Sequence, residues 1–485
     1  MGVFSPGDDG FFMDMRGRLY IILLLLLGFA TAMLPGGEAR IVFTSDLHGG
    51  IRNFAALVPA IRKHTNERTV ALDLGDTVMG GFDAEYAENS TGMAQALNRA
   101  GIHYWVPGNH DFELPDANFR DFVKCFRGTA LGGDWSKAGV TGQPFAIIET
   151  GGVRLAVIGL TDPKMPRRML PGAAMAFRDP RQVLREVLPE VRKRRPHLIV
   201  LAWHNGLYSV AGPLGKFLKE FPEIGLVLGA HSHHENPGER VGNTLYVQAG
   251  AHGHAAGVVD IATGDTGGVK LTSFLIRGDA LGPDPETAAL ARRLRDGCRG
   301  VYHRKLGNFS PPLKQVGREE YGSQLGGLCA EALRRCAGAD AGVVWMPVTD
   351  IPFLKRGVRC YGELYRILDH RDEVCSLVVT KAELSAFLRE QRKLDRKLKR
   401  ECVLFAAGIK LHRSPRGEVS KIDAPETFRL AVSAYRIAES RVLRPLVGHA
   451  DRAFRRTGVI ERDAAALFLA EPNGHDPQKY HRERK

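Results

Sequence analysis

The chain has 485 residues, of which 44% are hydrophobic and 25% charged. This composition is ordinary for globular proteins and excludes a low-complexity chain, and the length exceeds that of a single hydrophobic core, so we expect two domains. The formal net charge is +13, and the surplus lies late in the chain, because residues 276–485 hold 40 Lys and Arg against 27 Asp and Glu.

Residues 1–38 have the layout of a secretory signal peptide. Arg16 and Arg18 precede the apolar run Leu19–Ala30, and the small residues at positions 30–32 fit a cleavage site. The run is shorter than the roughly 20 residues that span a bilayer. We therefore expect a periplasmic or secreted protein with no stable membrane span after cleavage, and an uncleaved anchor is the alternative.

Residues 39–275 alternate apolar, β-rich runs with helical stretches, which predicts a layered α/β catalytic domain. The predicted helices are Asn53–His64, Gly92–Ala100 and Arg181–Lys193. The predicted strands are Arg40–Thr44, Val70–Leu74, Tyr104–Val106, Arg154–Ile158, Leu198–Ala202, Leu226–Leu228 and Leu245–Gln248. In such sheets ligands gather beyond the carboxyl ends of the strands, so polar residues at those ends are the candidates for a site.

The second part of the chain begins with a helix-start signal. Asp284 is a capping residue and is followed by Pro285 at the first helical position. Residues 276–313 are accordingly predicted to form a linker helix and hinge, ending in the segment NFSPPL. Residues 314–470 would form the second domain, with helices near Gln324–Cys336 and Lys381–Lys399, and residues 471–485 a basic tail.

Two features of the second domain leave alternatives open. A basic stripe at helical spacing either faces an anionic partner or is a solvated helix face; it consists of Arg389, Arg392, Lys393, Arg396, Lys397 and Arg400. Six of the seven cysteines also lie late, and they either form disulfides, which export permits, or stay free thiols.

Five motifs with metal-ligand chemistry each follow a predicted strand. They are Asp46-Leu47-His48, Gly75-Asp76, Gly108-Asn109-His110-Asp111, His204-Asn205-Gly206 and Gly229-Ala230-His231-Ser232-His233, with Gln248-Ala249-Gly250 behind them. Divalent transition metals accept imidazole nitrogen and carboxylate or amide oxygen. One carboxylate such as Asp76 can bridge two cations about 3.5–4 Å apart, and two cations together activate water and stabilise an in-line displacement. The motifs thus predict a two-metal hydrolytic site.

This order of motifs resembles the calcineurin-like metallophosphoesterase superfamily. The resemblance implies two divalent cations, drawn from Mn, Zn, Fe and Co, and a metal-activated hydroxide as the attacking group. Asp46, His48, Asp76 and His233 would hold the first cation, and Asp76, Asn109, His204 and His231 the second. His110 would be no ligand but a general acid or electrostatic stabiliser. His234, His252 and His254 are expected at the rim of the site or in structural roles.

The amino-acid sequence of the C-terminal part is similar to that of the 5'-nucleotidase family. The similar segments are Leu325–Arg334, Gly338-Ala339-Asp340, Gly362–Leu368 and Leu377–Leu388. This likeness implies a metallophosphoesterase sandwich of mixed β-sheets flanked by helices, followed by a smaller α/β domain. In that family the second domain supplies the nucleoside pocket and closes over the substrate by rotating about the linker.

The chain departs from the family where the nucleoside should bind. The family's Asn-x-Gly-Gly-x-Arg segment appears as Trp345–Asp350, its Pro-Phe-x-Asn segment as Asp369–Asp372, and no Gly-Gly-Asp-Gly segment follows Tyr435. The base sandwich is therefore not carried over. Trp345, Tyr361 or Tyr435 would replace it, or would be core residues.

The residues after His110 also differ from the family. The family commonly has Gly-Asn-His-Glu-Phe-Asp, in which the last carboxylate orients the histidine, whereas this chain has Asp111-Phe112-Glu113. Glu113 would take the orienting position with one more methylene, and Asp111 is a second candidate for the catalytic set.

We thus expect an exported, monomeric phosphoesterase that hydrolyses a small phosphate ester, first of all a nucleotide or related phosphorylated metabolite. A thiosulfohydrolase-like activity is one alternative. The other is an envelope binding protein that uses its basic C-terminal domain. Because the basic stripe lacks interleaved aromatic residues, no nucleic-acid partner is expected.

Overall fold

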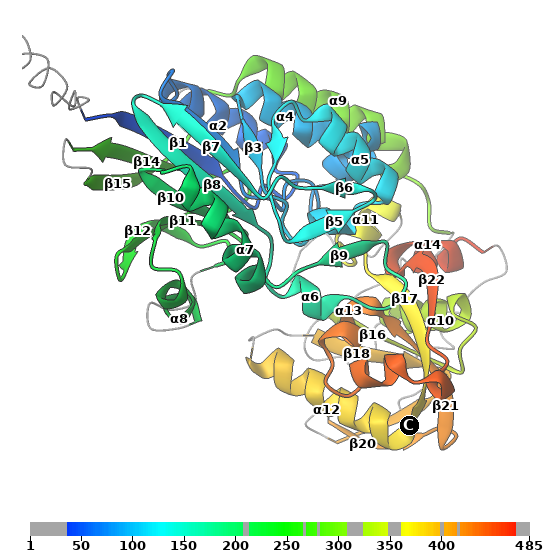
Figure 1. Cartoon of the computed structure of the whole chain (residues 1–485). Coiled ribbons are helices and arrows are strands. Elements are labelled where there is room, and N and C mark those ends of the chain that lie inside the picture. The colour runs from blue at the N-terminus through cyan, green and yellow to red at the C-terminus, as the bar shows by residue number, and fades with distance from the viewer. Residues whose placement is uncertain are drawn as a thin grey trace, which may run out of the picture.

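The computed structural model of the chain describes residues 36–206, 213–264, 268–278, 282–307, 324–347, 360–397, 402–414 and 418–471. The predicted signal up to residue 35, the NFSPPL hinge segment and the tail from residue 472 lie outside the described residues. Among the described helices, none combines the length and the apolar character that crossing a bilayer requires. The chain forms two lobes, with residues up to the early 300s in one and the remainder in the other (Figure 1).

The first lobe contains two six-stranded sheets. One has the order β15-β14-β1-β2-β3-β4. Its strands are β1 (Glu38–Thr44), β2 (Thr69–Asp73), β3 (Tyr104–Trp105), β4 (Thr129–Ala130), β14 (Ala256–Thr263) and β15 (Val269–Ile276). Strands β1 to β4 are parallel, whereas β14 and β15 are antiparallel.

The second sheet has the order β12-β13-β11-β10-β8-β7. Its strands are β7 (Phe145–Thr150), β8 (Val153–Leu160), β10 (Leu198–Trp203), β11 (Ile224–Gly229), β12 (Glu235–Val241) and β13 (Thr244–Ala249). The four central strands are parallel and the two edge strands antiparallel. Both sheets are therefore mixed, and their parallel strands end at the same edge of the lobe.

The two sheets face each other across an apolar core. Side chains alternate along each strand, so every second residue points into this core. Ile41 and Phe43 of β1 point into this core together with Val157 of β8 and Val200 of β10, whereas Val42 points to the other face. The helices α2 (Ile51–Lys63) and α4 (Gly92–Ala100) pack on the first sheet, and α9 (Pro285–Tyr302) packs on these two helices. The helices α7 (Pro180–Lys193) and α8 (Pro213–Glu220) pack on the second sheet.

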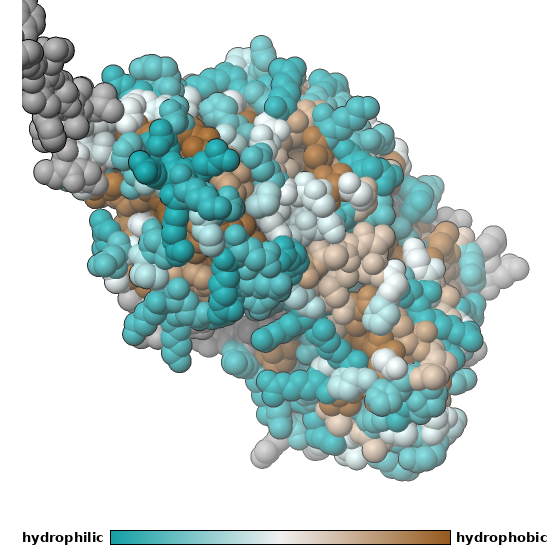
Figure 2. Space-filling view, in the orientation of Figure 1, coloured by the Kyte–Doolittle hydropathy of each residue, from teal (hydrophilic) through white to brown (hydrophobic). Residues whose placement is uncertain are grey.

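Smaller elements connect the layers. They are α3 (Phe82–Tyr86), α5 (Asp116–Cys125), α6 (Met165–Arg168) and the three-stranded sheet formed by β5 (Trp135–Lys137), β6 (Val140–Thr141) and β9 (Met175–Phe177). Most of the face seen in Figure 2 is hydrophilic, in keeping with burial of the apolar residues inside the layers.

The second lobe is built on a five-stranded sheet of order β18-β16-β21-β17-β22. The strands are β16 (Ala341–Pro347), β17 (Glu373–Thr380), β18 (Cys402–Ala407), β21 (Thr427–Ser433) and β22 (Arg455–Ile460). Helices α10 (Gln324–Cys336) and α14 (Glu461–Leu469) cover one face, and α12 (Lys381–Lys397) and α13 (Ala434–Glu439) the other. Helix α11 (Tyr361–Tyr365) and the hairpin of β19 (Lys410–Arg413) and β20 (Val419–Asp423) complete it.

The predicted α/β fold class with mixed, helix-flanked sheets is confirmed. Each predicted strand overlaps an observed one, and the linker helix begins at Pro285 with Asp284 as its cap, whose side chain accepts a hydrogen bond from the Thr287 amide. The exact domain boundaries stay predictions. Within the described residues the six cysteines from Cys125 to Cys375 carry free thiols, so the structure favours the free-thiol alternative for them.

A buried carboxyl in the first lobe is expected to make stability depend on pH. Asp134 is 2% exposed, its Oδ2 accepts a hydrogen bond from the Thr161 amide at 2.9 Å, and burial raises its pKa to about 7. Because the folded pKa lies above the unfolded value of about 3.9, the folded chain binds the proton more tightly. This contribution is fully present below about pH 4 and is lost as the pH rises through about 7.

Asp134→Asn should remove the loss of folding stability that the parent shows as the pH rises toward 7. Urea unfolding midpoints measured from pH 4 to 7.5 should therefore converge or cross, with the variant gaining stability relative to the parent by about 2–4 kcal/mol toward the upper end. A difference between the two proteins that stays constant over this range would contradict the assignment.

Candidate metal centre

The loops at the carboxyl ends of the strands bring the seven predicted ligands together. Asp46 and His48 follow β1, Asp76 follows β2, His204 follows β10, and His231 and His233 follow β11. Asn109 and His110 lie in the loop after β3. Because both sheets contribute, the centre lies where the edges of the sandwich meet, and neither sheet alone supplies a complete ligand set.

The backbone at these positions is held in the left-handed region. The φ angles are 51° at Asp46, 47° at His48, 51° at Asp76, 70° at His231 and 61° at His233. A non-glycine residue in this conformation costs of order 1–3 kcal/mol and persists only when its surroundings fix it, so such residues gather at functional sites. Five of the seven predicted ligands thus share a strained backbone.

The first group of ligating atoms belongs to Asp46, His48 and His233, which lie within 4.8 Å of one another. The Nε2 atoms of His48 and His233 are 3.0 Å apart, and Nε2 of His233 is 3.7 Å from Oδ1 of Asp46. The second group is Asp76, His204 and His231. Nε2 of His204 lies 3.1 Å from Oδ2 of Asp76 and 3.9 Å from Oδ1 of Asp46.

Asp76 connects the two groups, as a bridging carboxylate must. Its Oδ2 is also 3.8 Å from Nε2 of His48, and its Oδ1 accepts the His110 amide at 2.8 Å. The carboxylate is buried, with 1% of its surface exposed. One carboxylate therefore lies between two imidazole-rich groups, which is the arrangement that a pair of divalent cations uses.

Unsatisfied polar atoms show that this donor set fits cations. Within the described residues, Oδ1 of Asn109 is buried and makes no hydrogen bond, and the buried Nε2 of His204, although 3.1 Å from Oδ2 of Asp76, is not aligned for a hydrogen bond to it. Buried polar atoms are rarely left in this state, and a bound ion commonly accounts for those that are. The opposite nitrogens are held by backbone: Nδ1 of His48 contacts the Met79 carbonyl at 2.7 Å and Nδ1 of His204 the Leu74 carbonyl at 2.5 Å. Such outer contacts aim Nε2 at the metal.

The protonation states of the histidines also fit a cation-binding centre. Burial lowers the pKa of His48 and of His231 to about 4, so both rings are neutral at pH 7, the form that binds metal. Burial also acts on His204, but the Asp76 carboxylate outweighs it and raises the pKa of His204 to about 10. The carboxylates thus hold a positive charge at the place where a cation would displace the proton.

Two further aspartates support the ligand loops. The carboxylate of Asp111 accepts the amides of Asp76 (2.8 Å), Thr77 (3.0 Å) and Gly108 (2.9 Å). Burial raises the pKa of Asp111 to about 7. Asp73, at the end of β2, accepts the Thr44 and Thr77 hydroxyls at 2.7 Å each. Asp111 therefore holds the turns that carry Asp76 and Asn109, and its contacts do not place it beside the His110 ring.

His110 and Glu113 form a close pair. Nδ1 of His110 lies 2.6 Å from Oε1 of Glu113. Burial lowers the pKa of His110, but the carboxylates of Glu113 and Asp76 outweigh it and raise it to about 10. Burial by itself raises the pKa of Glu113, but the positive charge of His110 outweighs burial and lowers the pKa of Glu113 to about 2. The pair is thus ionised at neutral pH, and the His110 ring centroid is 5.6 Å from that of His48.

The second lobe contributes a residue that the sequence did not point to. His370 stacks on His110 with ring centroids 5.0 Å apart and planes 15° apart, and the Arg371 amide donates to Oε2 of Glu113 at 3.0 Å. His370 stands in the segment Asp369–Asp372, where the family's stacking phenylalanine is missing. The missing phenylalanine was the one sequence feature that could have pointed to His370, because in the family this segment faces the substrate.

The other candidates have separate environments. His252 lies at the rim, 5.4 Å from the His48 ring and 5.5 Å from the His233 ring between centroids, and its amide donates to the Asp46 carbonyl. Tyr361 is 1% exposed and therefore cannot stack on a base. Tyr435 is 37% exposed, with the Arg168 guanidinium 5.6 Å from its ring.

Comparison with known proteins agrees with this geometry. Residues 39–235 match the calcineurin-like phosphoesterase family. Endonuclease YhcR of Bacillus subtilis is 23% identical over 401 residues, which are 73% of this chain and 32% of its own length. The 5'-nucleotidase of Vibrio cholerae is 25% identical over 246 residues, 44% of each chain. The chain thus spans less than half the length of these two curated relatives.

A solved structure shares the fold of both lobes. The crystal structure of a Staphylococcus aureus protein described as a 5'-nucleotidase, in complex with alpha-ketoglutarate, superposes with a TM-score of 0.72 and 17% identity, covering 90% of this chain and 97% of that one. At this identity the likeness establishes the fold. Residues 39–235 are accordingly a calcineurin-like phosphoesterase domain, in a chain that has the two-lobed fold of 5'-nucleotidases.

Proposed function

We propose that the chain is a metal-dependent phosphoric ester hydrolase with a two-cation centre. The observation that carries this proposal is the pair of ligand groups joined by Asp76, with the His110–Glu113 pair beside them. Asp46, His48, Asp76 and His233 would hold one cation, and Asp76, Asn109, His204 and His231 the other. When bound, two divalent cations supply a lowered pKa for water and charge neutralisation for the phosphoryl group.

The protein's own groups supply the rest of the chemistry. His110 carries a proton at neutral pH, because Glu113 and Asp76 raise its pKa, and can donate it to the leaving oxygen or hold the phosphoryl oxygens. Glu113 fixes the ring by accepting from Nδ1. Asp111 holds the loops of Asp76 and Asn109 in place through backbone amides.

We propose a small phosphate ester as the substrate, with a nucleotide or a related phosphorylated metabolite first. The names of relatives such as the Vibrio cholerae 5'-nucleotidase support this choice. We also propose that the protein is exported, on the layout of residues 1–38 alone. The monomeric state stays a prediction. The choice among Mn, Zn, Fe and Co is a matter for metal analysis, because imidazole and carboxylate ligands suit all four.

Asp76→Asn tests the centre most directly. Replacing the carboxylate by a neutral amide removes the charge that both cations share, so we expect the metal content to fall from two ions to one or fewer per chain. Hydrolysis of phosphate esters should fall to background. Elemental analysis and a panel of nucleotides, cyclic nucleotides, UDP-sugars and simple phosphate esters, each with Mn or Zn, would measure both.

The matched control is Asp260→Asn, which changes a half-exposed carboxylate of β14 that pairs with Arg40 at 2.6 Å. It should keep both metals and the activity. Two bound ions and full turnover in Asp76→Asn would refute the centre. A metal-loaded parent that hydrolyses no phosphate ester would refute the activity, and preferential hydrolysis of an S-sulfonated thiol would favour the thiosulfohydrolase alternative.

A further inference from the structure

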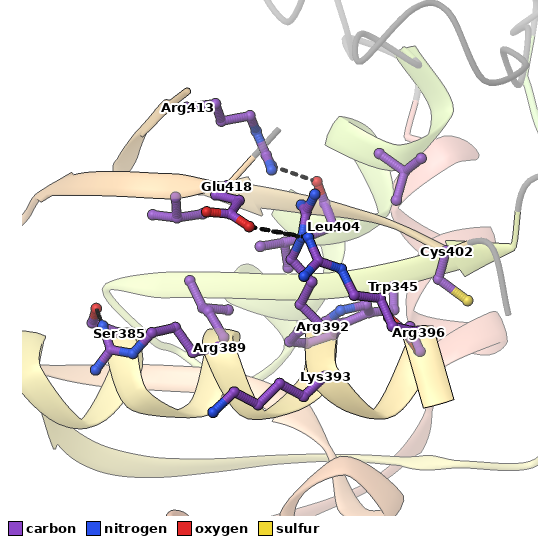
Figure 3. A pocket seen from close by; sticks show the side chains of 14 residues that line it. Trp345, Ser385, Arg389, Arg392, Lys393, Arg396, Cys402, Leu404, Arg413 and Glu418 are labelled. Carbon is purple, nitrogen blue, oxygen red and sulfur yellow. Dashed lines mark hydrogen bonds and ion pairs between the residues drawn. The ribbon is translucent and has the colours of Figure 1, made fainter. Parts of the chain in front are cut away.

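A separate cavity of about 250 Å³ lies in the second lobe (Figure 3). Its walls come from the end of β16, α12 from Ser385 onward, the start of β18, and the β19–β20 hairpin. All its lining residues fall between positions 345 and 419, so none belongs to the metal groups. The cavity is therefore a different site, and its capacity to bind a ligand does not depend on the proposed hydrolase activity.

The cavity wall is strongly cationic. Five lining side chains carry positive charge, against the two acids Asp395 and Glu418; they are Arg389, Arg392, Lys393, Arg396 and Arg413. Four of the six residues of the predicted basic stripe thus line a cavity. Arg389 and Lys393 are exposed and project from the same face of α12 in Figure 3.

The acid Glu418 lies at the Arg396 end of the cavity. Glu418 pairs with Arg396 at 3.0 Å and lies 3.9 Å from Arg392. Arg389 bonds the neutral Ser385 hydroxyl at 2.6 Å. Like charges four residues apart on a helix repel by a few tenths of a kcal/mol, and Arg389 with Lys393 and Arg392 with Arg396 are two such pairs. A bound anion would relieve this repulsion at the Arg389 end.

The floor of the cavity is apolar and aromatic. Trp345 lines it together with Leu388, Val403 and Val419. The other tryptophans, Trp105, Trp135 and Trp203, are 1–3% exposed, whereas Trp345 is only half-buried. The Arg436 guanidinium lies 5.0 Å from the Trp345 ring centroid and adds positive charge beneath it. A half-buried indole within a cationic wall offers a stacking or packing surface next to anion-binding groups.

We propose that this cavity binds a small organic anion with a phosphate- or sulfonate-type head and a flat apolar body. The head would be held by Arg389 and Lys393, and the body would lie against Trp345. The volume corresponds to about eight water molecules at roughly 30 Å³ each, which suits a ligand of one ring and one anionic group. A long polyanion would fit less well, because the concave part of this surface is short.

The test uses 4-nitrophenylphosphonate, whose P–C bond is not an ester and whose ring quenches tryptophan fluorescence. Binding to the full-length protein should be saturable, quench Trp345 and weaken as salt is raised. Arg389→Gln/Lys393→Gln should weaken binding by at least ~10-fold, because two charge-assisted contacts are lost. Trp345→Phe should abolish the quenching while calorimetry still detects binding.

The matched control is Lys410→Gln/Arg455→Gln, which removes the same charge from two exposed cations of this lobe outside the cavity. It should bind like the parent, and so should Asp76→Asn, which separates the cavity from the metal centre. Equal binding by the Arg389/Lys393 variant, or binding lost in Asp76→Asn, would overturn the proposal. So would binding of anionic vesicles or polyphosphate through these residues with no binding of the phosphonate.

Discussion

His110→Ala is expected to lower kcat for phosphate ester hydrolysis by about 10²–10⁴-fold while both metals stay bound. The ring is not among the seven proposed ligands, and it is kept protonated because the Glu113 and Asp76 carboxylates raise its pKa to about 10. Its loss removes a proton donor and a positive charge from the place where charge develops in the transition state. Steady-state kinetics together with elemental analysis measure the two quantities separately.

The leaving group distinguishes the two roles considered for His110. If the ring donates a proton, the loss in kcat should be larger for an alkyl phosphate than for 4-nitrophenyl phosphate, whose phenolate leaves unaided. A stabiliser of phosphoryl oxygens would lower both by a similar factor. His449→Ala, a change at an exposed histidine of the second lobe, should leave kcat unchanged. An active His110→Ala enzyme would exclude both roles.

The positions of the ligand loops could be predicted from the sequence, because each motif comes directly after an apolar strand. A strand end fixes where the following side chain lies, and parallel strands end at one edge of a sheet. Asp46 after β1 and His231 after β11 could therefore be placed together, and the structure brings the His231 amide within 2.9 Å of Asp46 Oδ1. The left-handed backbone at five of the ligands had no such signal in the sequence, since none of the five is glycine.

The fold was predictable where local patterns are strong. The central strands β10 and β11 are continuous apolar runs, and most of β8 is one, which is typical of strands buried on both faces. The edge strands β12 and β15 were not predicted. Strand β12 (ENPGERV) is polar, and in β15 exposed residues alternate with half-buried ones over the first half of the strand. Short strands such as β5 and β6 depend on tertiary contacts rather than on their own residues.

The contacts between the lobes had no local signature. Glu85 on α3 and Arg462 on α14 are separated by 377 positions, and His370 reaches His110 from a segment without a recognisable motif. Pairs of this kind depend on how the lobes pack, and a single sequence carries no information on which Glu meets which Arg. The Glu85–Arg462 pair lies beside a hydrophobic cluster that runs without a break from one lobe into the other.

Arg462→Met is expected to destabilise the chain by about 3 kcal/mol, because it removes one of the two arginines that pair with the buried Glu85 carboxylate and leaves the other acceptors of Arg462 without their donor. Nη1 of Arg371 stays 2.8 Å from Oε1 of Glu85. The Arg462 side chain is 0% exposed and that of Glu85 1%. Nη2 of Arg462 donates to Oε1 of Glu85 at 2.9 Å and to the Tyr86 hydroxyl at 2.8 Å, and Nη1 to the Leu368 carbonyl at 2.6 Å. Thermal and urea unfolding of the full chain measure the loss.

The double variant Glu85→Gln/Arg462→Met separates the ion pair from simple packing. Removing the carboxylate charge as well should recover part of the lost stability, because Arg371 alone then no longer has to balance a buried carboxylate. Arg455→Met, at an exposed site, should change stability by less than about 0.5 kcal/mol. A double variant as unstable as the sum of its single variants would contradict coupling between Glu85 and Arg462. Because these residues lie on opposite lobes, any rotation of the second lobe about the predicted hinge must first break this pair, so Arg462→Met should also make the lobes easier to separate in hydrogen exchange at α3 and α14.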